Sequence, residues 1–417
     1  MGSVNCNKLA KAGQACQASL ANKTIPSTDS EVSIDVPPES EEFDVVVIGC
    51  GCAGMAAAIE AKHTGKKPVI LEKMPAPAGN TIYAGGIICA TGTYVQKQQG
   101  IQDSLEQFYK DMMAVSKEKG DAELTRMYVE RSSEQIRWLS EVCGVKFRPI
   151  EKEIWPMLQR WHVVDAPIHP AGAHLSQCML DTVRKLGIPV RFNAKAIELT
   201  KGSNLSCSGV MVVQNGKPME IKARGGVVIA TGGFSANREL LDRHIGKGAA
   251  RMPNRGSSCL TGENITLTEP FSPMLVNMDQ FHGGPIHGPT KANPSILVNY
   301  GIVVTYDGAR FVDEASTYVA IAKALPKLIL TNKAMIIIDD QVTGMSTVDD
   351  RIKRYERAGA KFYRANSVSE LAAEAGLPAD ALVKTVDEYN AAVKAGKANL
   401  LAPPNTLKNP RQIAKAP

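Results

Sequence analysis

The 417-residue sequence lacks long hydrophobic runs. No stretch of 18 or more consecutive apolar residues occurs, so a membrane-spanning helix is not expected. The N-terminus has no apolar core of the kind that a secretory signal needs, and it has no twin arginine. The composition therefore predicts a protein without a membrane span.

Disulfide and metal frameworks are absent as well. The nine cysteines are an odd number without framework spacing, which predicts reduced thiols and a cytoplasmic protein. Cys50 and Cys52 are separated by one residue, whereas thiol oxidoreductases use a CxxC spacing, so buried thiols are favoured over a redox pair. The sequence contains neither a CxxCH haem motif nor a ferredoxin-type cysteine run, and we expect no metal site.

The sequence has no basic cluster of the kind that binds nucleic acid. The net charge of +6 is spread along the chain, and the densest basic stretch, RIKRYER at 351–357, contains acidic residues. Such a stretch is typical of a solvated helix face. We therefore expect no nucleic-acid partner.

Regular structure is predicted to begin at Phe43. Residues 1–42 are rich in Ser, Pro, Glu and Lys without apolar periodicity, which predicts a flexible leader. The segment FDVVVIG (43–49) is a β-branched apolar run, typical of a parallel strand buried on both faces. A helix ending at Thr64-Gly65 and a second strand, PVILE (68–72), complete a βαβ unit.

Further elements follow the βαβ unit. Helical periodicity occurs at 103–118, 122–142 and 174–186. The segment IPVRFNAKAIEL (188–199) has a strand pattern, and Asn215-Gly216 predicts the turn of a hairpin.

A separate buried strand is predicted at GGVVIATGGF (225–234), where the apolar run ends in glycines. Near residue 286 the composition changes to polar loops, prolines and longer helices. We therefore expect a first domain at 43–285 and a second, mixed domain at 286–417.

The glycines of GCGCAG (49–54) have a specific physical interpretation. Gly49 allows a tight turn after the strand, Gly51 lets the backbone approach a pyrophosphate, and Gly54 lets helix and strand pack closely. The helix N-terminus supplies amide donors, and Glu72 at the end of the next strand can accept hydrogen bonds from a ribose. Dinucleotide binding is favoured over a tight turn without a ligand.

Several segments in the same order resemble one flavoprotein family. They are VVVIGCGCAGMAAAIEA, VILEKMPAPAGNT, AGGIICATG, GAHL, VVIATGGFSAN, TGEN and GARFVDEAS. The chain resembles the FAD-dependent fumarate reductases and succinate dehydrogenases, with features of the ketosteroid dehydrogenase and enoate reductase branch. The resemblance implies an α/β fold: a Rossmann-like FAD-binding domain with a parallel central sheet (first part 43–285) and an α+β capping domain (286–417).

The resemblance also implies a set of cofactor-binding residues. Glu263 stands where the family usually has Asp, and Cys89 occupies a common Asn position. The residues expected to bind FAD are Gly49, Gly51, Cys52, Ala53, Gly54, Glu72, Lys73, Asn80, Thr81, Ala84, Gly85, Gly86, Ala196, Thr231, Gly232, Gly233 and Glu263.

The catalytic candidates also come from the resemblance. The family moves a hydride between flavin N5 and the β-carbon of an alkene conjugated to a carbonyl, while a second group handles the proton. Fumarate reductases use an Arg four residues after the Glu of an RFxxE motif, and here that position is Tyr318. A tyrosine resembles the ketosteroid dehydrogenase branch and favours a bulkier enone or enoate over fumarate. The alternative is an ordinary amphipathic tyrosine on a capping helix.

His282 is the second catalytic candidate. MDQFHGGPIH (278–287) resembles the strand that carries a substrate-binding His, but Gly284 falls on that position and His282 lies two residues earlier. Two residues along a strand keep the same face, so His282 would still reach the site. A satisfied polar residue at a domain edge is the favoured alternative.

Two absences concern partners. No second GxGxxG occurs in strand–helix context, so an external electron carrier is expected beside the alkene or carbonyl substrate. Nothing matches the family's C-terminal FAD-domain segment, so the chain is expected to be C-terminally truncated. The sequence thus predicts either an oxidoreductase or a catalytically incompetent flavoprotein fragment or subunit that needs a partner polypeptide.

Overall fold

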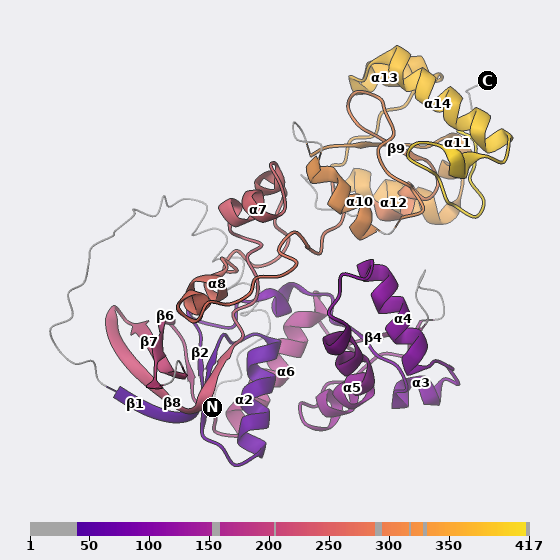
Figure 1. The fold of residues 1–417 in the computed structure, drawn as a ribbon. Helices are drawn as coiled ribbons and strands as arrows, with labels where there is room; N and C mark the ends of the chain where they lie inside the picture. The colour runs from indigo at the N-terminus through magenta and orange to yellow at the C-terminus, as the bar shows by residue number, and fades with distance from the viewer. Residues whose placement is uncertain are drawn as a thin grey trace. The chain divides into compact units, whose positions relative to one another are not determined.

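The computed structural model describes residues 40–151, 159–203, 206–287, 294–316, 318–327 and 332–413. Chain contacts divide the protein into two compact units (Figure 1). Unit 1 contains the described residues up to Asn237 together with Gly256–Leu275, and unit 2 contains Arg238–Arg255 and the residues from Val276 onward.

A six-stranded sheet forms the centre of unit 1, in the order β5-β2-β1-β8-β7-β6. The first four strands are mutually parallel, and β8, β7 and β6 form an antiparallel meander. The expected α/β fold with a parallel-containing central sheet is confirmed. The strands are β1 (Ser40–Ile48), β2 (Pro68–Leu71), β5 (Val190–Arg191), β6 (Ala194–Lys201), β7 (Cys207–Gln214) and β8 (Lys217–Ile229).

The all-apolar sequence of β1 is explained by two cores, one on each face of the sheet. Val47 packs in a core with α2 (Cys52–His63) and α6 (Ala171–Lys185). Val46 and Ile48 point to the opposite face and pack with apolar residues of the meander. Both alternating faces of β1 are therefore buried.

The remaining part of unit 1 is a helical region with a small hairpin. The helices predicted at 103–118 and 122–142 are α4 (Leu105–Ser116) and α5 (Ala122–Glu141), which begin after the capping side chains of Ser104 and Asp121. The other elements are η1 (Asn80–Tyr83), β3 (Ile87–Cys89), α3 (Tyr94–Gln98), β4 (Trp161–Val163), α8 (Glu263–Thr268) and η4 (Glu269–Phe271).

Two strand predictions within the central sheet need correction. The pattern at 188–199 forms two strands, because Asn193 has φ +54 and the chain turns between β5 and β6. The hairpin turn at Asn215-Gly216 is confirmed, but the segment after it is continuous with 225–229 in the single long strand β8. That segment is also not fully buried, since Val228 is 37% exposed.

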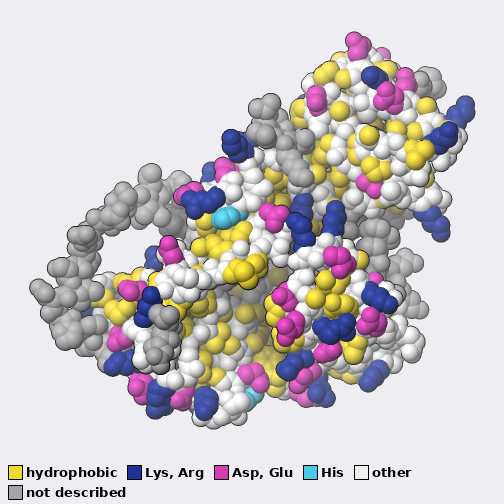
Figure 2. Space-filling view, in the orientation of Figure 1, with side chains coloured by type: hydrophobic (Ala, Val, Ile, Leu, Met, Phe, Trp, Pro, Cys, Tyr) yellow, Lys and Arg dark blue, Asp and Glu magenta, His cyan; other side chains and the backbone are white. Residues whose placement is uncertain are grey.

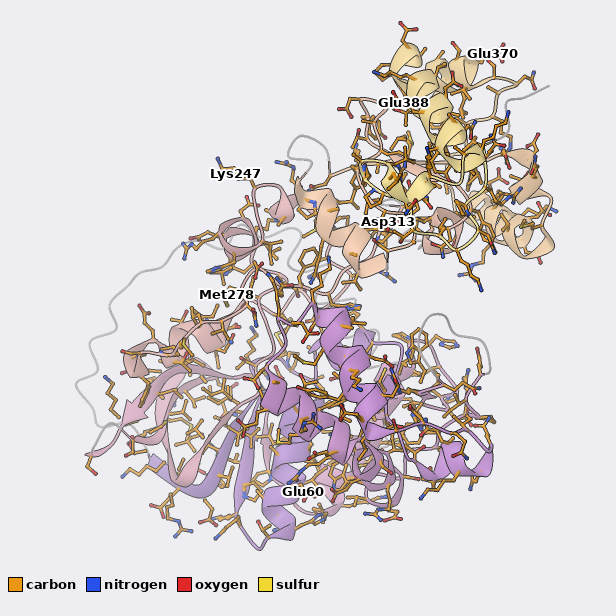
Figure 3. The ribbon with its side chains drawn as sticks, turned by 45° about the vertical axis from the view of Figure 1, so that its right-hand side comes forward. Glu60, Lys247, Met278, Asp313, Glu370 and Glu388 are labelled. Carbon is orange, nitrogen blue, oxygen red and sulfur yellow. The ribbon has the colours of Figure 1, made fainter. Side chains whose placement is uncertain are left out.

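The regular structure of unit 2 is mainly helical, with a two-stranded antiparallel sheet of β9 (Ile302–Val304) and β10 (Met335–Ile337). Glu370 and Glu388 lie on the exposed sides of their helices (Figure 3). The helical elements are α7 (Arg238–His244), η3 (Ala249–Arg251), α9 (Ser295–Val298), α10 (Tyr318–Ala324), η5 (Leu325–Lys327), α11 (Asp340–Thr343), α12 (Ser346–Arg357), α13 (Val368–Ala375), α14 (Ala379–Lys394) and η6 (Ala398–Leu400).

A buried ion pair accounts for the RF motif in unit 2. The Arg310 guanidinium donates to both carboxylate oxygens of Glu314, at 2.9 and 2.5 Å, and also to the carbonyl oxygen of Pro403. Glu314 further accepts from the Val303 backbone and from Asn405. Both charges are satisfied within the unit, so this pair holds β9 to the C-terminal loop.

Candidate functional site: a glycine turn and its surroundings

The glycine turn after β1 combines two obligatory glycines with one at which an added Cβ would make only an ordinary van der Waals contact. Gly49 has φ +108, and a Cβ there would collide with the Ala230 carbonyl oxygen at the end of β8. A Cβ on Gly54 would collide with the Gly49 carbonyl oxygen. At Gly51 the nearest atom to an added Cβ is the Thr81 hydroxyl, at 3.7 Å. Gly51 therefore leaves room in front of the α2 N-terminus.

The segment from Asn80 to Gly86 lies against this turn. The backbone N–H of Cys52, in the first turn of α2, donates to the Thr81 hydroxyl oxygen at 3.0 Å. Gly172 of α6 donates to the Ala84 carbonyl oxygen at 2.9 Å, and a Cβ there would collide with the Thr81 carbonyl oxygen. These contacts fix the segment between the N-terminal turns of α2 and α6.

Glu72 closes β2 beside the glycine turn, with only 8% of its surface exposed. Its two carboxylate oxygens accept from the backbone N–H groups of Cys50 and Met74, each at 3.0 Å. Burial raises the pKa of Glu72, and these two hydrogen bonds act in the opposite direction. Each oxygen keeps a lone pair for a further donor such as a ribose hydroxyl.

Lys73 and Glu263 join β2 to the start of α8. Their side chains form an ion pair, and the Thr261 hydroxyl donates to the same Glu263 oxygen at 2.7 Å. Burial acts to raise the pKa of Glu263, but the hydrogen bonds from Lys73 and Thr261 outweigh it and lower that pKa. The pair thus brings two predicted cofactor residues together from distant parts of the sequence.

The loop after β8 also lies beside the glycine turn. Gly232 has φ +77 and lies against Leu260, whereas a Cβ on Gly233 would meet no atom of the described residues within 4 Å. Among the described residues, the buried Thr231 hydroxyl has no hydrogen-bond partner. Asn80 is held by the Ser257 backbone, which donates to its side-chain oxygen at 2.8 Å. Sequence reasoning missed Ser257 and Gly172, of which only the glycine of GAHL gave a signal.

The predicted site residues differ in exposure and in the polar groups that are available to bind a cofactor. Cys52 lies next to Met179, with the two sulfur atoms 3.2 Å apart, and burial raises the pKa of its thiol to about 11. The Cys52 thiol is therefore not ionised, and its backbone N–H is already donated to the Thr81 hydroxyl oxygen. The Ala196 side chain packs in the core with Val212 and Ile221, while Ala53, Ala84 and Gly85 are exposed.

The catalytic candidates lie in unit 2, whereas the glycine turn lies in unit 1. Tyr318 is the first residue of α10, and its side chain lies outside the described residues. His282 is exposed and does not lie on a strand: residues 281–286 have no regular structure. The prediction of a strand at 278–287 is therefore wrong, and the alternation argument for His282 does not apply.

The comparisons with known proteins identify the family. The model of the FAD binding domain family matches residues 44–415. The chain belongs to this family. The predicted relationship and the predicted cofactor, FAD, are both confirmed.

Two curated relatives are similar to this chain over most of its length. The NADH:fumarate oxidoreductase of Klebsiella pneumoniae is 31% identical over 86% of this chain. A fumarate reductase (cytochrome) of Shewanella frigidimarina is 29% identical over 95% of the chain. This chain spans 38% and 68% of the lengths of these two relatives.

A solved structure of a dehydrogenase is also similar to this chain. The 3-ketosteroid Δ4-(5α)-dehydrogenase of Rhodococcus jostii, in complex with 4-androstene-3,17-dione, is 28% identical and superposes with a TM-score of 0.69. The match covers 88% of this chain and 82% of that one.

The described residues fit FAD. The space at Gly51 and Gly233, the unpartnered Thr231 hydroxyl and the exposed Ala84-Gly85 backbone lie around one strand–helix turn. Within the described ranges, no helix is long and apolar enough to cross a membrane, and no group of three or more His, Cys, Asp or Glu side chains is placed to hold a metal. Acidic and basic side chains are interspersed on the face shown in Figure 2.

Proposed function

We propose that the protein is part of an FAD-dependent oxidoreductase that acts on a C=C bond conjugated to a carbonyl. The observation that carries this proposal is the glycine turn, where Gly49 and Gly54 are fixed by backbone contacts and Gly51 alone leaves room for a pyrophosphate. Membership of the FAD binding domain family and the reductase and dehydrogenase relatives support it.

In this proposal, unit 1 holds the cofactor. Amides of the α2 N-terminus and the backbone near Gly51 would bind the pyrophosphate, and Glu72 would accept from the ribose hydroxyls. Asn80 to Gly86 and Thr231 to Gly233 would hold the remaining part of FAD. Bound FAD supplies hydride chemistry at flavin N5.

Tyr318 is the proposed proton donor or acceptor at the substrate α-carbon. An unperturbed tyrosine has a pKa of about 10, so its hydroxyl is protonated at neutral pH and ready to donate in a reduction. A dehydrogenation would need a lower tyrosine pKa. Tyr318 in place of the arginine of fumarate reductases favours a ketosteroid or another bulky enone or enoate. The electrons come from, or go to, an external carrier.

A second candidate is a flavoprotein subunit that needs further polypeptide for activity. It is favoured by β8, which pairs with β7 only as far as Lys222 and with β1 as far as Ile229. From residue 223 to 229, one edge of β8 has no strand beside it among the described residues. An unpaired edge in a central strand is normally covered in an active enzyme.

The test begins with the absorbance spectrum of the purified protein after gel filtration and incubation with FAD. Stoichiometric bound flavin is expected. Turnover is then measured anaerobically with enones, enoates and fumarate and a reduced dye. Tyr318→Phe is expected to keep FAD and lose 10²- to 10⁴-fold in turnover, while Tyr306→Phe, at a partly exposed tyrosine of unit 2, serves as the control.

The outcomes separate the candidates. Turnover that depends on Tyr318 supports the enzyme, and equal turnover of both tyrosine variants contradicts the role of Tyr318. Bound flavin without turnover of any substrate favours the subunit. A colourless protein after incubation with excess FAD contradicts the enzyme and favours a subunit whose cofactor site needs further polypeptide.

A further inference from the structure

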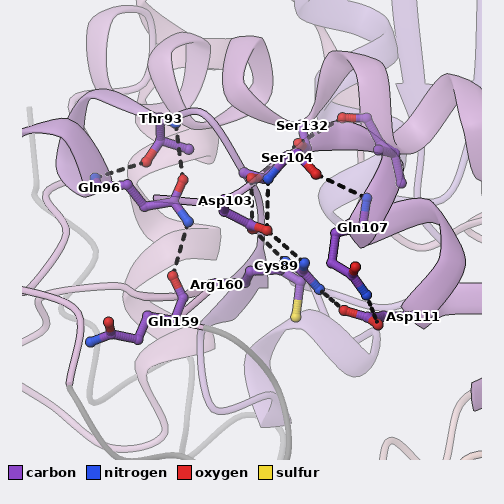
Figure 4. Close-up of polar contacts among 12 residues, drawn as sticks. Cys89, Thr93, Gln96, Asp103, Ser104, Gln107, Asp111, Ser132, Gln159 and Arg160 are labelled. Atoms are coloured by element: carbon purple, nitrogen blue, oxygen red, sulfur yellow. Dashed lines mark hydrogen bonds and ion pairs between the residues drawn. The ribbon is translucent and has the colours of Figure 1, made fainter. Parts of the chain in front are cut away.

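A buried charge cluster lies in unit 1 outside the predicted site. The Arg160 guanidinium, which is fully buried, donates to both oxygens of Asp103 at 2.5 and 2.7 Å and to Asp111 at 2.7 Å (Figure 4). It also lies over the Phe108 ring, 4.6 Å from its centroid. Such a bidentate arrangement fixes orientation as well as charge.

The cluster holds the chain segment that follows the predicted flavin-lining residues. The Arg160 carbonyl oxygen accepts from the Ala90 backbone at 3.1 Å, directly after β3. The Thr91 hydroxyl donates to the Asp103 carboxylate at 2.7 Å. Arg160 thus fixes residues 90 and 91 through both its main chain and its side-chain partner.

The β3–β4 hairpin connects the segment held by Arg160 to the residues predicted to bind FAD. Cys89 pairs with Trp161 and Ile87 with Val163, and the Val164 N–H donates to the Gly86 carbonyl oxygen at 2.9 Å. Ile87, which follows Gly85-Gly86, is 47% exposed. Ala84, Gly85 and Ile87 are therefore exposed near the glycine turn, while Gly86 between them is buried.

A purely stabilising role explains this cluster poorly. Burying a guanidinium and a carboxylate has a large desolvation cost, and buried ion pairs are often replaceable by apolar residues without loss of stability. Their best-attested use is to impose one arrangement on the surrounding chain. Here the imposed arrangement is the register of β3 against β4.

We propose that Arg160 is a positioning residue of the cofactor site, which acts through Asp103 and the β3–β4 hairpin to hold Ala84–Ile87 against the N-termini of α2 and α6. This inference rests on the proposed binding of FAD in unit 1. Among the described residues, the hydrogen bonds of the guanidinium go to Asp103 and Asp111 and not to the glycine turn or Glu72.

The full chain offers a matched control. Arg310 of unit 2 is also buried, also donates to both oxygens of one carboxylate and also holds a backbone carbonyl group. Arg160→Lys and Arg310→Lys both keep the charge and lose the planar fork. Comparison of the two separates positioning of the cofactor site from general loss of stability.

The first readout is FAD binding, measured by quenching of flavin fluorescence and by visible circular dichroism well below the Tm of every variant. We expect Arg160→Lys to raise the FAD Kd about tenfold or more and to change the visible dichroism. For Arg310→Lys, we expect the FAD Kd and the visible dichroism to stay within twofold of the wild-type values. Equal FAD affinity in wild type and Arg160→Lys, or equal losses in the two lysine variants, would overturn the inference.

The second readout does not need FAD. Amide exchange of residues 84–90 is expected to be faster in ligand-free Arg160→Lys than in wild type or Arg310→Lys, and unchanged exchange overturns the inference. If wild type binds no FAD, the proposed function fails while this readout still decides the positioning role. Should Arg160→Lys not fold, Asp111→Asn removes the less buried carboxylate, with the same two readouts and the same criteria.

Discussion

Left-handed glycines near the α2 helix are of two kinds. Gly49 (φ +108) and Gly65 (φ +76) both have backbone conformations that L residues rarely adopt, yet only Gly49 faces a backbone atom. Replacement by alanine costs about 1 kcal/mol at either position for the conformation alone. At Gly49 the collision with the Ala230 carbonyl adds about 1–3 kcal/mol.

We therefore expect Gly49→Ala to destabilise the protein more than Gly65→Ala in urea unfolding. Gly49→Ala should also lose FAD binding, because the collision moves the β1–α2 turn away from β8. Gly65→Ala, at the other end of α2, should bind FAD like wild type. Equal unfolding midpoints for the two variants would show that the turn relaxes without strain.

His162 provides a pH-dependent test. Its Nδ1 lies 2.8 Å from the Arg160 carbonyl oxygen and its Nε2 lies 2.7 Å from the Thr93 hydroxyl. A carbonyl only accepts, so Nδ1 carries the proton and the neutral ring accepts from Thr93 at Nε2. Burial lowers the pKa of His162.

The unfolded chain then binds more protons than the folded one below the ordinary histidine pKa of about 6.5. The free energy of unfolding is expected to fall as the pH drops below this value. His162→Gln should flatten this part of the pH profile, measured by urea unfolding between pH 7 and 5. An unchanged slope in His162→Gln would contradict the assignment.

At the scale of elements, local sequence patterns predicted most of the helices and strands of unit 1. The apolar run of β1, the capped helices α4 and α5, and the Asn215-Gly216 turn are set by periodicity and turn chemistry within a few residues. The break at Asn193 has a non-local cause, since the backbone of 193–194 donates to the carbonyl oxygens of Met74 and Glu72. The Arg160 cluster likewise joins residues about 50 positions apart, which no local pattern reveals.

Hydrogen exchange of β8 tests its unpaired edge. The Ala230 N–H donates to the Ile48 carbonyl oxygen, so by alternation the Val228 backbone also faces β1, while that of Val227 and Ile229 faces away. We expect the amides of Val227 and Ile229 to exchange much faster than that of Val228. Equal protection of all three would show that another segment covers this edge.

At the scale of the whole molecule, each apolar core cluster belongs to one unit. The clusters around α2, the sheet and the β3 region contain only residues of unit 1, and those around β9, α12 and α14 contain only residues of unit 2. Composition had placed the boundary near residue 286, whereas the contacts divide the chain after Leu275 and assign Arg238–Arg255 to unit 2. Contacts between distant segments, rather than composition, determine this division.

Two separate cores predict two calorimetric unfolding transitions. Leu180 in α6 and Leu382 in α14 are both almost completely buried, one in each unit. Truncation to alanine costs about 2–5 kcal/mol at such positions. We expect Leu180→Ala to lower the Tm of only the transition whose Tm rises when FAD is added, because the glycine turn lies in unit 1. Leu382→Ala should lower the Tm of only the other transition. A single transition that both variants shift equally would mean that the two cores unfold as one cooperative structure.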